Sequence, residues 1–103
     1  MNEMFNNADA FNSTVNLNTT EVITMYAMFN SANVFNQPVD FNTAKVTNMR
    51  AMFARTDNFD SAINFSNTSN VGSMRSMFYQ AKYFNQPVNF DTSNVTDFRN
   101  MFD

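Results

Sequence analysis

Hydrophobic residues recur along the chain at a nearly constant interval, and polar residues fill the positions between them. The dipeptide Met-Phe occurs five times, at intervals of 24, 24, 25 and 24 residues. Other apolar positions keep the same register, in the columns Phe11, Phe35, Phe59 and Phe84; Val15, Val39, Ile63 and Val88; Leu17, Phe41, Phe65 and Phe90; and Val22, Val46, Val71 and Val95. We therefore expect a single repeat domain, 1–103, with repeats 4–27, 28–51, 52–76 and 77–100 and a partial repeat 101–103.

Two local periodicities alternate inside each repeat. From Val46, apolar residues follow at steps of three and four through Met49, Met52 and Phe53, which is typical of one helix face. At 39–41 and 88–90 apolar residues alternate with a polar one, which predicts a short strand. Thr, Ser and Asn between the strand and the helical segment are good helix N-caps, whereas Phe, Asn and Thr within the helical segment are weak helix formers. Each repeat is thus predicted to hold a short strand and a short helix, which is either regular or partly 3₁₀.

A unit of this size cannot bury its apolar face alone, so successive units must cover one another. The pattern predicts an α/β fold, a leucine-rich-repeat-like right-handed solenoid with one short parallel strand and one short helix in each coil of 24–25 residues. A parallel β-solenoid without helices is the alternative. Asn-rich disorder is disfavoured because the Phe and Met residues are periodic.

Composition narrows the functional classes. The chain has no Cys and no His, so thiolate chemistry and the commonest general base and metal ligand are missing. None of the acidic residues forms a column in all four repeats, and we predict a non-catalytic protein without a cofactor or metal. The net charge of −3 argues against nucleic-acid binding, and no apolar run is long enough to cross a membrane.

The runs "VTNMRAMFARTDNFD" and "MFYQAKYFNQPVNFDTSNVTDFRNMF" resemble the BspA-like surface-protein repeat, a leucine-rich-repeat relative found in mycoplasma-type lipoproteins. The similarity covers the four repeats. The usual Trp of that repeat is replaced by Leu17, Phe41, Phe65 and Phe90, which keep a bulky inward residue. The resemblance implies a cell-surface protein with a role in adhesion, host contact or antigenic display and no enzymatic activity. Its partner would be a protein or a glycan, and the alternative is a structural spacer without a specific ligand.

Outward positions around the predicted strands are the main binding candidates, because strand side chains alternate between two faces. In leucine-rich-repeat proteins the equivalent concave surface usually binds the ligand. The candidates are Asn16, Asn18, Gln37, Asp40, Asn42, Asn64, Ser66, Gln86, Asn89 and Asp91. The surface is poor in the aromatic and Arg residues of interface hot spots, so a merely solvated face is the other interpretation.

Three further polar columns are candidate binding rows. Arg50, Arg75 and Arg99, in line with Tyr26, form a basic row that could bind acidic glycans or could pair with local acids such as Asp57 and Asp97. Asn12, Asn36, Asp60 and Asn85 form either a polar binding row or a ladder that satisfies backbone groups. Thr19, Thr43, Thr68 and Thr92 form a row such as ice-binding solenoids carry, although variable residues flank it.

The two ends of the sequence have no obvious polar cap. Uncapped end repeats would expose apolar side chains and unpaired backbone edges. We therefore expect end-to-end self-association through the terminal coils.

Overall fold

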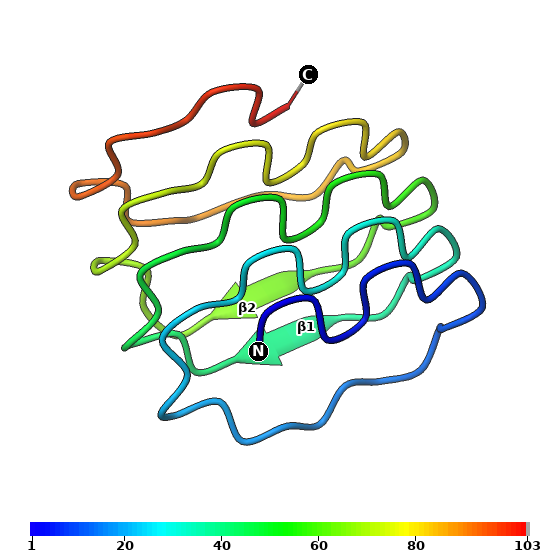
Figure 1. Ribbon diagram of the computed structural model, residues 1–103, viewed down its shortest axis with the longest axis horizontal. Helices are drawn as coiled ribbons and strands as arrows, with labels where there is room; N and C mark the ends of the chain where they lie inside the picture. The colour runs from blue at the N-terminus through cyan, green and yellow to red at the C-terminus, as the bar shows by residue number, and fades with distance from the viewer. Residues whose placement is uncertain (103) are drawn as a thin grey trace.

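The computed structural model describes residues 1–102, so Asp103 of the partial repeat lies outside the described residues. The chain makes one circuit in each repeat, and successive circuits lie side by side (Figure 1). Two strands are formed, β1 (Val39–Phe41) and β2 (Ile63–Phe65), which pair in parallel with Asp40 opposite Asn64. Both lie where the alternation of apolar and polar residues predicts a strand. The equivalent residues 15–17 of the first repeat and 88–90 of the fourth repeat are not strands, contrary to prediction.

The short helix predicted in each repeat is absent from residues 1–102, where the corresponding segments are hydrogen-bonded turns. Ala27 and Ser31, and likewise Ala51 and Arg55, have φ between 54° and 61°. A left-handed residue at every fourth position is incompatible with a right-handed helix and costs each non-glycine residue about 1–2 kcal/mol. The prediction of a helix is therefore wrong for these segments.

Hydrogen bonds between repeats explain why the turns replace a helix. The amides of alternate residues, including Ala27, Phe29 and Ser31, donate to carbonyls of the next repeat at 2.8–2.9 Å. Amides between them close local turns, as in the bond from Met28 N to Met25 O at 3.3 Å. Because an isolated helix of two turns is marginal in water, the bonds to the neighbouring repeat prevail.

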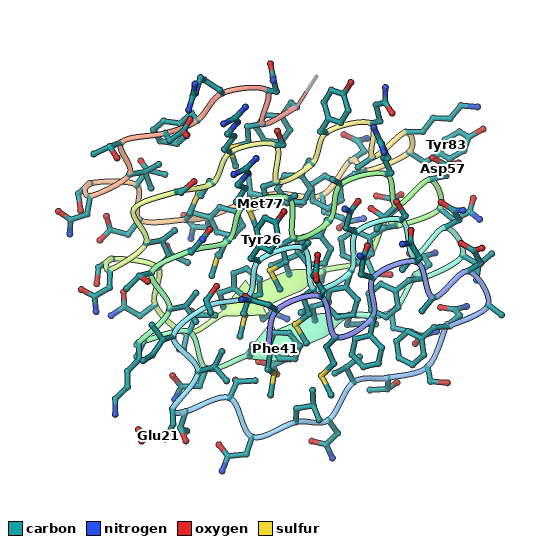
Figure 2. All side chains as sticks on the ribbon, in the orientation of Figure 1. Glu21, Tyr26, Phe41, Asp57, Met77 and Tyr83 are labelled. Atoms are coloured by element: carbon teal, nitrogen blue, oxygen red, sulfur yellow. The ribbon has the colours of Figure 1, made fainter. Side chains whose placement is uncertain are left out.

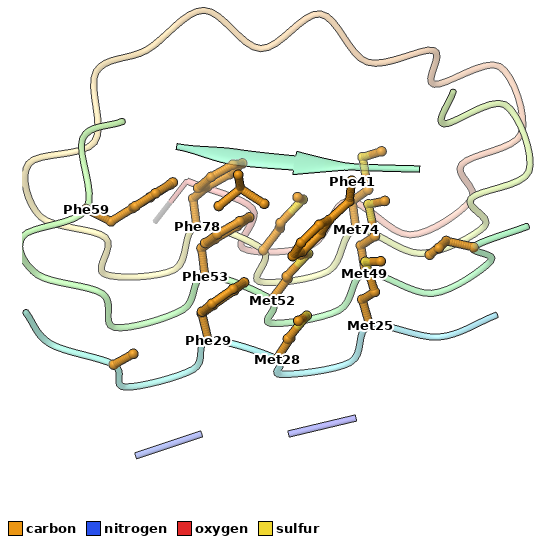
Figure 3. Packing of buried hydrophobic residues seen from close by; sticks show 14 of the residues in the cluster. Met25, Met28, Phe29, Phe41, Met49, Met52, Phe53, Phe59, Met74 and Phe78 are labelled. Atoms are coloured by element: carbon orange, nitrogen blue, oxygen red, sulfur yellow. The ribbon is translucent and has the colours of Figure 1, made fainter. Parts of the chain in front are cut away.

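The apolar columns form the core inside the circuits. Phe41 and Met77 lie inside, whereas Glu21 lies at the periphery (Figure 2). Phe29 and Phe53 are fully buried, and their rings stack with centroids 5.4 Å apart and planes within 5° (Figure 3). A second Phe column lies beside the first, with the rings of Phe53 and Phe59 only 4.6 Å apart. Buried Met side chains complete the interior, as expected for a flexible side chain that packs well against aromatic rings.

The Thr column is a ladder between repeats, buried at Thr19, Thr43 and Thr68 and exposed at Thr92. The hydroxyl of Thr43 donates to the carbonyl of Asn67 at 2.6 Å, and the amide of Asn67 donates back at 3.2 Å. The hydroxyl of Thr19 donates to Asn42 O and that of Thr68 to Asp91 O in the same way. Since Thr43 is fully buried, this column is not a surface for ice.

Candidate binding groove beside strand β2

A groove of about 300 Å³ lies on the outward side of β2, between this strand and residues 88–90 of the fourth repeat. Three of its side chains, Asp40, Asn64 and Asn89, belong to one column of exposed outward strand positions. The groove is lined by Asp40, Ile63, Asn64, Phe65, Ser66, Asn89 and Phe90. The structure therefore brings four of the predicted binding residues together at one place.

The apolar part of the groove comes from columns that the sequence assigns to the core. Ile63, Phe65 and Phe90 are only half-buried, unlike the fully buried Val39 of the second repeat. The rings of Phe65 and Phe90 stack with their centroids 5.6 Å apart. Sequence reasoning missed these three residues as groove residues because their periodicity is that of buried positions.

On the side of the fourth repeat, β2 has no backbone hydrogen-bond partners among the described residues. Among the described residues, no backbone hydrogen bond joins 62–66 to 87–91, whereas β2 is paired with β1 on its other side. In a parallel pair, alternate peptide groups of a strand point to each neighbour. The peptide groups of Ile63 and Phe65 that point toward the fourth repeat are therefore left for water or a ligand to satisfy.

Ser66 is the extra residue of the 25-residue repeat. Asn42, Asn67 and Asp91 each accept a hydrogen bond from the amide two residues later, so Asn67 is the structural equivalent of Asn42 and Asp91. Two residues of the third repeat, Ser66 and Asn67, thus oppose one residue in its neighbours, which is the definition of a bulge. The Ser66 hydroxyl accepts from Thr43 N at 3.0 Å and donates to Asn42 Oδ1 at 3.3 Å. These two bonds fix Ser66 at the wall of the groove.

Three other predicted binding residues have a structural role in turns. The side-chain oxygens of Asn18, Asn42 and Asp91 accept from backbone amides at 3.1, 3.1 and 3.0 Å. The hydroxyl and the amide of Ser93 donate to Asp91 and lower the pKa of its carboxyl. These oxygens are Asx-turn acceptors and are less available to a ligand.

The polar column that begins with Asn12 is a ladder between repeats. Asn12 Oδ1 accepts from Asn36 N at 2.8 Å, Asn36 Oδ1 from Asp60 N at 2.8 Å, and Asp60 Oδ1 from Asn85 N at 2.9 Å. The predicted binding residues Gln37 and Gln86 join this ladder, since their side-chain Nε2 atoms donate to Asn12 Oδ1 and Asp60 Oδ1. Asn16, the first-repeat member of the outward column, is exposed and does not line the groove.

The basic row is partly engaged by neighbouring side chains. Arg99 donates two hydrogen bonds of 2.9 Å to Asp97, and these bonds hold the pKa of Asp97 well below its usual range. The guanidinium of Arg50 lies 5.7 Å from the ring centroid of Tyr26. The predicted pairing with Asp97 is confirmed. The pairing with Asp57 is not found among residues 1–102, and Asp57 lies away from Tyr26 (Figure 2).

The part of the chain that the structure describes contains no group of three or more acidic residues arranged to hold a metal ion. It also contains no helix long and apolar enough to span a membrane. The arrangement at the groove offers hydrogen-bond donors and acceptors and one carboxylate. It is suited to binding a polar molecule.

Comparison with known proteins places this repeat architecture in a family. No curated protein and no solved structure matches the chain. The family model described as "Mycoplasma protein of unknown function, DUF285" matches twice, over residues 1–64 and 39–103. Together the two matches span the whole sequence, and the double match agrees with the internal repetition. The chain belongs to this mycoplasma-type repeat family of unknown function.

Proposed function

We propose that this chain is a non-catalytic interaction module, displayed on a cell surface, that binds a protein or glycan ligand. The observation that carries the proposal is the groove beside β2. Asp40, Asn64, Ser66 and Asn89 come from three different repeats and meet around one hollow, next to backbone groups without partners. Exposed groups of this kind are available to a ligand.

The surface location and the roles in adhesion or antigenic display rest on the resemblance to BspA-like lipoproteins. The family match supports a mycoplasma-type repeat protein, and the BspA-like assignment itself is part of this proposal. The arrangement of the fold as a solenoid is likewise our proposal. Both of its forms have parallel pairing between repeats, as seen between β1 and β2 and in the bridges Thr24–Asn48, Asn48–Ser73 and Ser73–Asp97. The parallel β-solenoid is favoured because residues 1–102 contain no helix.

The proposal is tested by adding fluorescently labelled protein to cultured animal cells and measuring bound protein by flow cytometry. We expect saturable binding that decreases in the double variant Asn64→Ala/Asn89→Ala. The matched control is Asn16→Ala, which removes the same group from the same column outside the groove. Binding that is equal in all three proteins would contradict a role of the groove.

A structural spacer is the second candidate function. It is favoured by the ladder of Asn12, Asn36 and Asp60, whose exposed side chains accept hydrogen bonds from the neighbouring repeat. A spacer would show no saturable binding to any cell type, and its outward residues could be replaced without effect.

A further inference from the structure

The groove differs from the rest of the outward face in its supply of hydrogen-bonding groups. The carboxamides of Asn64 and Asn89 each carry both donors and acceptors. A suitable ligand must therefore present several groups that donate and accept at short spacing, as the hydroxyls of a sugar do.

The size and charge of the groove restrict the class of ligand further. A volume of about 300 Å³ is at the lower end of the roughly 300–1,000 Å³ of small-molecule sites, so the groove suits a single ring rather than an extended chain. Asp40 is the only charged side chain in the lining, and it is exposed. Its carboxylate repels anions. A purely apolar ligand would leave the carboxamides without partners, which is costly.

Two aromatic residues lie beneath the groove. Phe65 and Phe90 are half-buried and stacked on each other on the inward face, so they hold the two rows of backbone at a fixed spacing below the side chains of Asn64 and Asn89. A peptide strand cannot be added between β2 and residues 88–90, because the stacked rings already hold the two rows 5.6 Å apart.

We propose that this groove binds one uncharged sugar ring, with Asn64 and Asn89 as its main hydrogen-bonding side chains. The proposal rests on the interaction function proposed above and names the ligand class of the same site. The Ser66 hydroxyl, held by Thr43 and Asn42, positions the wall of the groove.

The test is ligand-observed NMR on the intact chain with methyl glucoside, methyl galactoside and N-acetylglucosamine as probes. We expect saturation transfer to at least one probe, and shifts of the Asn64 and Asn89 side-chain amide signals on titration. Asn64→Ala or Asn89→Ala should each weaken binding about fivefold, the effect of one lost hydrogen bond. Asn16→Ala should leave the affinity unchanged.

Glucuronate serves as the charged probe. It should bind more weakly than methyl glucoside, and the difference should narrow in Asp40→Asn, where the repulsion is removed. The proposal is overturned if no neutral sugar binds, if the two amide signals do not shift, or if glucuronate binds more tightly.

The same sugars, added in excess to the cell-binding assay, separate the two proposals. Cell binding that persists in excess sugar would overturn the sugar site and leave the interaction module, with a protein ligand in its place. Sugar binding without any cell binding would overturn the surface-interaction function and leave the sugar site.

Discussion

The Thr ladder predicts a specific loss of stability when one hydroxyl is removed from the middle of the chain. In Thr43→Val the side chain keeps its shape, so no cavity is created, but two hydrogen bonds to the peptide of Asn67 disappear. Each such bond contributes roughly 0.5–1.5 kcal/mol, and the buried position of residue 43 keeps water from replacing them. We expect the free energy of unfolding to fall by about 2 kcal/mol.

The loss is measured by urea unfolding followed by circular dichroism. For a chain of this size, a slope of about 1–1.5 kcal/mol per molar urea converts the loss into a midpoint lower by about 1.5 M. Thr92→Val is the matched control, because Thr92 belongs to the same column but is exposed. Its effect should stay within about 0.5 kcal/mol. Equal losses in the two variants, or an unchanged midpoint for Thr43→Val, would refute the ladder as a source of stability.

Three further predictions concern the core, the Asn ladder and the surface ion pair. Phe53→Ala should lower the free energy of unfolding by about 3–5 kcal/mol in the same urea assay, because it removes a fully buried ring that stacks on three other rings; a loss below about 1 kcal/mol would contradict this packing. Asn36→Ala removes the oxygen that accepts from the third repeat and should lower the free energy of unfolding by about 1–2 kcal/mol. Asn85→Ala should lower it less, because the side chain of Asn85 accepts from no later repeat among the described residues. The reverse order would contradict the ladder. Asp97 has a lowered folded pKa, so its stabilising contribution is complete above the ordinary value of 3.8 and is lost as the pH falls through the lowered pKa. Carboxyl ¹³C NMR should show Asp97 still ionised below its ordinary pKa of 3.8, and Arg99→Gln should return its pKa toward that value; no change in Arg99→Gln would refute this cause.

The core could be predicted from the sequence because burial follows the repeat. Phe29, Phe35, Phe53 and Phe59 are all fully buried, as their columns require. A column is visible without a structure since each repeat must cover the next with the same residue type. The local conformation could not be predicted in the same way. Steps of three and four suit a helix, but they also suit a series of turns, and Ala27 in a left-handed conformation leaves no trace in the sequence.

The candidate site was predicted in part. Alternation along the strands correctly placed Asp40, Asn64 and Asn89 on the outward face, and these residues line the groove. The same reasoning could not distinguish them from Asn42 or Gln86, whose side chains are engaged by turns and by the neighbouring repeat. Residue type and spacing are alike in the two sets. Only the hydrogen-bond partners separate them.

The sequence by itself determined the repeat length, the register and the residues that form the core, because these depend on a pattern of apolar side chains that recurs four times. The tertiary structure alone decided where backbone amides find their partners. Those partners lie about 24 residues away, so the choice between a helix and turns, and the place where pairing stops beside β2, depend on contacts between repeats. The groove exists where such contacts are missing, which no local pattern in the chain records.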